Sequence, residues 1–197
     1  AETNVPGLYA AGDTSLVARG HLSGALVIGE VAAESASEYA AGNGEVTLDD
    51  DQVESFKREL ETRLAQKNNP IAIEEFEFKV RRMISDYLKP PKNEYKLDRA
   101  LWWMDRFRKE LKTMVRVANV HDLFKCFEVE NIIQSATMCA IASKERKESR
   151  WSPWHYRTDY PEKNDAEWKK HIVLTCGSVP EDVKVSYKPI IKMEGRV

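Results

Sequence analysis

The sequence lacks a long apolar run, an excess of one charge and closely spaced cysteines. Thirty basic residues oppose 32 acidic ones, for a net charge of -2, which argues against a dedicated nucleic-acid surface. No apolar run is long enough to cross a bilayer, and no signal peptide is recognisable. Cys126, Cys139 and Cys176 lack the spacings that hold zinc or iron-sulfur clusters. These absences predict a soluble protein of a reducing cytoplasm, without a metal site, a nucleic-acid partner or a direct membrane span.

A Gly-rich phosphate-binding turn is missing as well, because GxGxxG occurs nowhere in the sequence. A complete dinucleotide-binding fold needs that turn and a βαβ unit around it. At 197 residues the chain can bury one core, or a core with an appendage. We therefore expect one compact domain with an extension, and no complete dinucleotide-binding domain.

The first motif present is VPGLYAAGD at residues 5–13. Leu8–Ala11 predicts a short buried strand, Gly12 a turn that a ligand can approach closely, and Asp13 a carboxylate at the strand's end. A helix rich in small residues is predicted from about Leu22 to Tyr39, and its first backbone amides suit an electron-rich group. An ordinary turn, in which Asp13 only caps the backbone, explains the same pattern.

After a glycine-rich stop at residues 41–44, apolar residues recur at helical spacing in four further segments. Asn69 and Pro70 indicate the N-cap and first residue of the second helix, and Pro90 and Pro91 stop it. The predicted apolar positions are Val53, Phe56, Leu60 and Leu64; Ile73, Phe76, Val80, Met83 or Ile84, and Tyr87; Ala100, Met104, Phe107, Leu111, Met114 and Ala118; and, in a helix from about His121 to Ser143, Cys126, Val129, Ile132, Ile133, Ala136, Cys139 and Ala140. The third set has the spacing of a bundle seam. On the fourth helix, both cysteines are predicted to be small core residues.

Two adjacent tryptophans, Trp102 and Trp103, flank the seam of the third of these helices. Neighbouring positions on a helix face different ways, so one indole should pack in the bundle while the other meets a neighbouring domain or partner. A basic run on the same helix either grips an acidic partner or is simply solvated.

Residues 144–161 read KERKESRWSPWHYRTDYP, so arginines alternate with aromatic rings. Arg150 and Arg157 can stack on these rings or pair with Glu148 and Asp159. We interpret the segment chiefly as a latch between the bundle and a neighbouring domain, although a nucleotide could use the same stacking. Beyond it, period-two patterning predicts two short strands, about 172–176 and 183–190.

The motifs at residues 5–13 and 144–161, one on each side of a helical bundle, resemble those of the FAD-dependent flavoproteins of the fumarate reductase, succinate dehydrogenase and adenylylsulfate reductase type. The resemblance implies a mainly α fold: an antiparallel helical bundle, preceded by the last strand and helix of an FAD-binding α/β domain and followed by a short β-hairpin. It places domain boundaries at 1–43, 44–150 and 151–197. It further implies that the chain is the C-terminal part of a longer polypeptide.

The same resemblance implies the site. Asp13 would bind an FAD hydroxyl, and the helix start at Ser23, Gly24, Ala25 and Leu26 would face the isoalloxazine ring near N1 and O2. Arg19 and His21 are weak catalytic candidates, because an arginine near this point helps hold a substrate carboxylate in fumarate reductases but is out of register here. The implied partners are a small-molecule substrate and an iron-sulfur electron-transfer subunit. The implied location is cytoplasmic, or peripheral to a membrane through a partner complex.

The substrate class stays open between members of this family. The pair Gly20-His21 and the tryptophan at 151 resemble adenylylsulfate reductases, whereas succinate-oxidising members have glycine at the latter position. We therefore expect an FAD-dependent oxidoreductase subunit of the fumarate reductase or succinate dehydrogenase type. The alternatives are an adenylylsulfate reductase alpha-type subunit, or a non-catalytic bundle that docks an electron-transfer partner.

Overall fold

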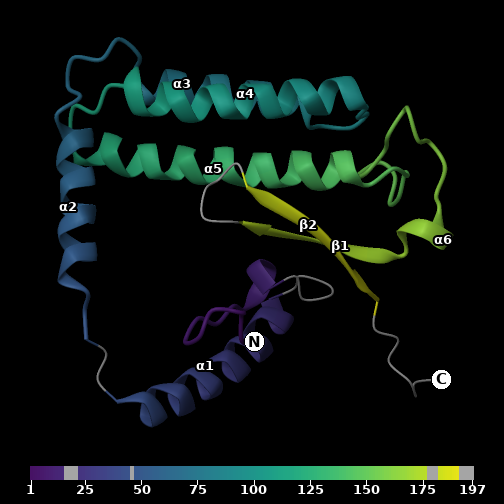
Figure 1. Cartoon of the computed structure of the whole chain (residues 1–197), viewed down its shortest axis with the longest axis horizontal. Coiled ribbons are helices and arrows are strands. Elements are labelled where there is room, and N and C mark those ends of the chain that lie inside the picture. The colour runs from purple at the N-terminus through teal and green to yellow at the C-terminus, as the bar shows by residue number, and fades with distance from the viewer. Residues whose placement is uncertain (16–21, 45–46, 177–181, 191–197) are drawn as a thin grey trace. The chain divides into compact units, whose positions relative to one another are not determined.

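The computed structural model describes residues 1–15, 22–44, 47–176 and 182–190 (Figure 1). The elements in chain order are the 3-10 helix η1 (Gly12–Ser15), α1 (Leu22–Asn43), α2 (Asp50–Leu64), α3 (Ile73–Tyr87), α4 (Glu94–Thr113), α5 (Val120–Glu145), α6 (Asp165–Trp168), β1 (Lys170–Cys176) and β2 (Val183–Pro189). The chain divides into two compact units, Ala1–Ser55 and Phe56–Val197. The division at residues 43 and 150 expected from the sequence stays a prediction.

The first unit contains η1 and α1, and it corrects the expectation of a buried strand at Leu8–Ala11. The backbone there forms one isolated antiparallel bridge, between Glu2 and Tyr9, and the Leu8 side chain is 54% exposed. A strand needs a neighbour along its whole length. In the described part of this unit, only the turn formed by the first few residues pairs with it. The Tyr9 hydroxyl instead ties the segment to α1 by donating to the Ser35 carbonyl, at 3.1 Å.

The second unit is built on α3, α4 and α5, which run side by side in Figure 1 as an antiparallel bundle. Short loops reverse the chain between them, and their apolar stripes meet in one core. The buried residues include Ile73, Phe76 and Val80 of α3; Leu97, Ala100, Met104, Phe107 and Leu111 of α4; and Leu123, Cys126, Val129, Ile133, Ala136 and Ala140 of α5. The bundle predicted from the spacing is confirmed, and Phe76 meets Phe107 edge to face with ring centroids 5.7 Å apart.

The predicted seam of α4 is too long at its C-terminal end. The helix ends at Thr113, so Met114 is 41% exposed and Ala118 lies outside the helix. The chain leaves the helix because residues 115–117 bond to the segment before α3: the Arg116 amide donates to the Ile71 carbonyl at 2.8 Å. The buried Val115 and Val117 then complete the core instead.

Helix starts show a second correction. Asn69 does not cap α3, whose N-cap is Ala72 without a side-chain hydrogen bond. The side-chain amide of Asn69 donates to the backbone carbonyls of Thr113 and Val115, at 3.2 and 3.0 Å. Free carbonyls at the end of α4 thus take the side chain that would otherwise begin α3.

Helix α2 contributes less apolar packing than its sequence predicts. Phe56 is 53% exposed, and the buried residue of the helix is Arg63. The Arg63 guanidinium bonds Glu59 at 2.7 Å and Glu130 of α5 at 2.8 Å, and it lies 4.6 Å from the centre of the Phe127 ring. An ion pair with a cation–π contact therefore attaches this helix to α5.

The C-terminal hairpin is confirmed, with β1 and β2 antiparallel and Lys170 opposite Pro189. It is joined to the end of α5, because the Tyr187 hydroxyl donates to the Glu145 carboxylate and Arg146 Nη2 donates to the Lys170 carbonyl at 2.9 Å. None of the helices in the described ranges combines the length and apolar character that a membrane span requires.

Candidate functional site

The start of α1 lies beside the turn at Gly12. Gly12 has φ +70°, a backbone conformation that favours glycine. A Cβ built on Gly12 would lie 3.4 Å from the Cβ of Ala25 in α1. Asp13 is exposed and its carboxylate has no hydrogen bond among the described residues. The first unit therefore brings one predicted ligand, Asp13, next to the helix end that carries the others.

The predicted ligands on α1 are accessible. Ser23 and Leu26 are exposed, whereas Gly24 and Ala25 are half-buried. Further along the helix, a Cβ added to Gly29 would meet nothing within 4 Å in the described chain. Exposed apolar side chains continue the same helix at Leu22, Leu26, Val27 and Val31. Arg19 and His21, the weak catalytic candidates, lie outside the described residues.

The arginine-rich segment after α5 forms the pairings predicted for it. Arg157 has no exposed surface; its guanidinium bonds Asp159 at 2.5 Å and Glu94 at 3.0 Å. It also donates to the carbonyls of Ser143 and Lys144 at 3.0 and 2.8 Å. Hydrogen bonding to Arg157 lowers the pKa of Asp159. Within the described residues this segment thus connects the start of α4 to the end of α5.

A second ion cluster surrounds Glu148, which is fully buried. Arg146 and Arg150 each bond its carboxylate at 2.7 Å, and the Asn164 amide donates to it at 2.8 Å. Burial alone would raise the pKa of Glu148, but these three hydrogen bonds lower it below its ordinary value. Glu148 is therefore the centre of an ordered polar cluster after α5, whereas a contact of this segment with a neighbouring domain stays a prediction.

Beside this cluster lies a pocket of about 460 Å³ between the C-terminal half of α5, the turn at residues 150–155 and β1. Lys92, Ser143 and His155 line it, and the exposed indoles of Trp151 and Trp154 stand at its edge. We call it the basic pocket. The sequence analysis did not predict a role for Lys92, because nothing in a Pro-Pro-Lys sequence shows that the lysine will be buried.

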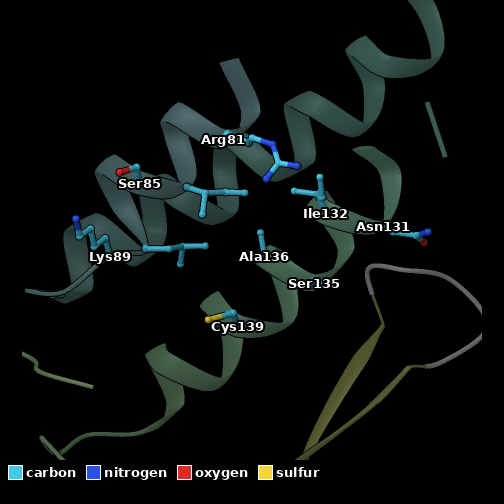
Figure 2. Close-up of a pocket in the computed structure, with 10 residues that line it drawn as sticks. Arg81, Ser85, Lys89, Asn131, Ile132, Ser135, Ala136 and Cys139 are labelled. Atoms are coloured by element: carbon cyan, nitrogen blue, oxygen red, sulfur yellow. The ribbon is translucent and has the colours of Figure 1, made fainter. Parts of the chain in front are cut away.

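A larger groove of about 750 Å³ lies between α3 and α5. Figure 2 shows Arg81, Ser85 and Lys89 on one wall and Ile132, Ala136 and Cys139 on the other. Cys139 is exposed here, which corrects its assignment as a core residue. Cys126 does lie in the core, and burial raises the pKa of its thiol to about 11.

The two adjacent tryptophans differ in burial, as predicted. Trp103 packs against the core and stacks on Phe107, with ring centroids 5.4 Å apart, whereas Trp102 is 46% exposed. The basic residues of the same helix are largely paired, Arg106 with Glu110 and Lys109 with Asp105. No group of three or more His, Cys, Asp or Glu within the described ranges is placed to hold a metal ion.

The second unit is an antiparallel bundle that carries an arginine cluster and a hairpin at its C-terminal end. Residues 78–195 match the family described as "Fumarate reductase flavoprotein C-term", which is more than half of the 197-residue chain. The chain belongs to this family.

Relatives agree with that assignment. The succinate dehydrogenase flavoprotein subunit of Rickettsia conorii is 27% identical over 135 residues, covering 65% of this chain and 22% of the relative. That of Bacillus subtilis is 25% identical over 205 residues, covering 95% of this chain and 34% of the relative. The chain thus spans about a fifth to a third of the length of these curated relatives.

Solved structures share the fold. Adenylylsulfate reductase from Archaeoglobus fulgidus superposes with a TM-score of 0.79 at 23% identity, over 89% of this chain and 30% of that chain. A quinol-fumarate reductase superposes with a TM-score of 0.77 at 21% identity, over 98% of this chain and 36% of that chain. The two structures superpose almost equally well, so the fold alone does not distinguish between them.

Proposed function

We propose that this chain forms the C-terminal portion of an FAD-dependent oxidoreductase subunit of the fumarate reductase or succinate dehydrogenase type. The observation that carries the proposal is the pairing of the Gly12 turn with the exposed start of α1. The complete subunit would pass electrons between a small substrate and an iron-sulfur partner subunit. A location peripheral to a membrane, through that partner, is part of the same proposal.

The residues present fit the cofactor. The Asp13 carboxylate is exposed and can accept a hydrogen bond from an FAD hydroxyl. The amides at Ser23, Gly24 and Ala25 are at the positive end of a 22-residue helix, where they can stabilise negative charge on a ring. Bound flavin would supply the redox chemistry, and the chain's own contribution is to bind and orient it.

The test is the flavin content of the whole subunit that carries this chain. Asp13→Ala removes the acceptor, and losing a hydrogen bond to a charged group costs about 1.5–3 kcal/mol, so flavin affinity should fall at least about tenfold. Asp50→Ala changes an exposed carboxylate in the first turn of α2 and is the matched control. Flavin absorbance per mole of protein is the measurement. Unchanged flavin in Asp13→Ala would remove Asp13 from the site.

We expect the 197-residue chain alone to hold FAD weakly or not at all, because it contains no Gly-rich phosphate-binding turn. Titrating FAD into the purified chain and measuring flavin fluorescence checks this. A stoichiometric yellow complex would show that the turn is dispensable.

Trp102 favours the alternative, a bundle that docks an electron-transfer partner. Its indole is 46% exposed, with the guanidinium carbons of Arg99 and Arg106 at 4.8 and 5.6 Å from the ring centre. A rigid exposed aromatic between two cations is typical of an interface anchor.

The two functions separate in one comparison. Trp102→Ala should weaken capture of an iron-sulfur partner and leave flavin content unchanged. Asp13→Ala should lower flavin content and leave the capture of the partner unchanged. Tyr95→Ala removes another exposed aromatic from α4 and is the control. Equal capture by all three proteins would count against docking through α4.

A further inference from the structure

Lys92 differs from the other buried charges of the second unit. Arg63, Glu148 and Arg157 are each bonded to a group of opposite charge. Lys92 is only 5% exposed, and its ammonium donates to the Ser143 hydroxyl at 2.9 Å. No carboxylate in the described ranges forms an ion pair with it. An ammonium has three donors, and a buried charge is costly without a partner of opposite charge. Lys92 can therefore bind an anion with the donors that Ser143 does not use.

His155 leaves a second polar atom unpaired in the same pocket. Its Nε2 is buried and has no hydrogen-bond partner among the described residues. Burial lowers the pKa of this imidazole, as do the charges of Lys92, Arg146 and Arg157, while a hydrogen bond with the Glu148 backbone opposes them. An anion bound to the Lys92 ammonium would accept a second hydrogen bond from His155 Nε2 once the imidazole is protonated, because the other ring nitrogen already donates to the Glu148 backbone.

The arginines of the pocket supply positive potential without competing for that ligand. Arg146 is bonded to Glu148 and to the carbonyls of Trp168 and Lys170. Arg150 is bonded to Glu148 and Asp165. Their guanidinium groups are therefore fixed in place, and Lys92 and His155 hold the unused bonding capacity.

The edge of the pocket offers flat apolar surface. Trp151 and Trp154 are 81% and 76% exposed. Trp151 has φ +56°, a conformation that bulky residues rarely adopt. Backbone strain of this kind costs on the order of 1–3 kcal/mol and is concentrated at ligand sites. Two indoles beside a buried cation suit a molecule that has an apolar or aromatic part next to its negative charge.

We propose that the basic pocket binds the anionic group, a carboxylate or a phosphate, of a small molecule. The Lys92 ammonium and the protonated His155 imidazolium donate to the anion, and Trp151 and Trp154 cover the apolar part. The volume of about 460 Å³ lies within the usual range of small-molecule sites. The site uses none of the residues assigned to flavin, and it stands whether or not the chain serves a flavoenzyme.

The experiment is an NMR titration of the histidine imidazoles in the full chain at constant ionic strength. Inorganic phosphate and sodium benzoate are the two probes, which distinguish a phosphate from an aromatic carboxylate, and His155→Gln assigns the signal. We expect a saturable shift of the His155 signal with at least one probe. The pKa of His155 should rise at saturation, because the bound anion favours the imidazolium. The titratable or charged groups around the ring are Lys92, Cys139, Arg146, Arg150, Arg157 and His171.

Lys92→Met is the decisive variant. It should weaken the binding of the probe at least about tenfold, the effect of losing a hydrogen bond to a charged group. Without the probe it should unfold at the same denaturant concentration or a higher one, because an unpaired buried charge has been removed. Lys109→Met, a change at an exposed lysine of α4, should bind like the original chain.

Failure takes clear forms. A His155 signal that does not move with either probe, or moves without saturating, overturns the proposal. So does equal binding by Lys92→Met and the original chain. None of these results depends on bound flavin, so the proposed function and the anion site can fail separately.

Discussion

Arg157 has no contact with solvent, and its guanidinium donates to the carboxylates of Asp159 and Glu94 and to the Ser143 and Lys144 carbonyls. Arg157→Met would leave the Asp159 carboxylate and the carbonyls of Ser143 and Lys144 without their donor. Each buried acceptor left without a donor costs about 1–3 kcal/mol, so we expect a loss of at least that size in the free energy of unfolding. Urea denaturation measures it.

The matched change is Arg82→Met, at an arginine whose side chain is 62% exposed and pairs with Asp86 one turn away. Exposed pairs of this spacing contribute about 0.3–0.5 kcal/mol. If the two variants lose similar stability, the Arg157 cluster is not a structural centre of the tail.

Glu148 gives the second unit an acid-sensitive contribution. The pKa of Glu148 is lowered in the fold, so its contribution is present above the ordinary value of 4.5 and is lost as pH falls through the lowered folded value. Glu148→Gln should therefore be less stable than the original chain at neutral pH, and the difference should shrink as pH falls below 4.5. Chemical denaturation at a series of pH values measures this difference.

The control for this pH series is Glu75→Gln, at an exposed carboxylate in the first turn of α3. Its difference from the original chain should change much less with pH. A Glu148→Gln difference that stayed constant down to pH values below 4.5 would mean that the carboxylate does not titrate differently in the folded and unfolded chains.

Single residues divide into those that sequence could predict and those that it could not. The pairings of Arg157 with Asp159 and of Arg150 with Glu148 were predictable, because each pair lies two residues apart. The burial of Lys92 was not, since Ser143 and His155 come from distant parts of the chain. Asn69 was misassigned for the same reason, because its acceptors, the Thr113 and Val115 carbonyls, come much later in the sequence, at the end of α4 and just after it.

Helix starts allow a prediction at the level of elements. The Asn119 side chain accepts from the Asp122 amide at 3.0 Å and caps α5. Asn119→Ala removes the acceptor and should cost roughly 1 kcal/mol, the usual cost of a lost N-cap. Thermal unfolding followed by circular dichroism measures the change.

Helix α3 offers the opposite substitution as a control. Ala72 occupies its N-cap in extended conformation and makes no side-chain bond. Ala72→Ser should gain stability of similar size, because serine is among the preferred capping residues. A loss in Ala72→Ser together with no loss in Asn119→Ala would show that capping does not limit these helices.

Elements with a continuous apolar period were predicted closely. The expected helix at 121–143 is α5, Val120–Glu145, and the expected strands match β1 and β2 within two residues. The seam of α4 ran past Thr113 because Met114 and Ala118 keep the spacing after the backbone has turned to pair with Ile71. Apolar spacing records which side chains could share a face, but hydrogen bonds from distant segments decide where the helix ends.

At the level of the whole molecule, the order of the two motifs around a bundle was enough to predict the family, and the match over residues 78–195 confirms it. The position of the proposed flavin site within a complete subunit cannot be predicted from this sequence. Its predicted ligands, Asp13 and the start of α1, lie in a unit whose described residues include none that is buried. Packing inside this unit therefore carries little of the information that specifies the site.

The second unit should fold without the first. All the buried hydrophobic residues that the structure describes lie between Ile73 and Trp168, so a chain of residues 47–190 keeps this core, α2 and the hairpin. Its melting temperature should differ from that of the full chain by less than about 4 °C, a shift that corresponds to roughly 1 kcal/mol for a domain of this size. Both chains are compared by circular dichroism at equal concentration and at two concentrations, because the exposed apolar face of α1 can promote self-association only in the full chain. A shortened chain that melts without cooperativity would mean that residues 1–46 stabilise the bundle, and the family's helical region could then not be treated as a separate folding unit.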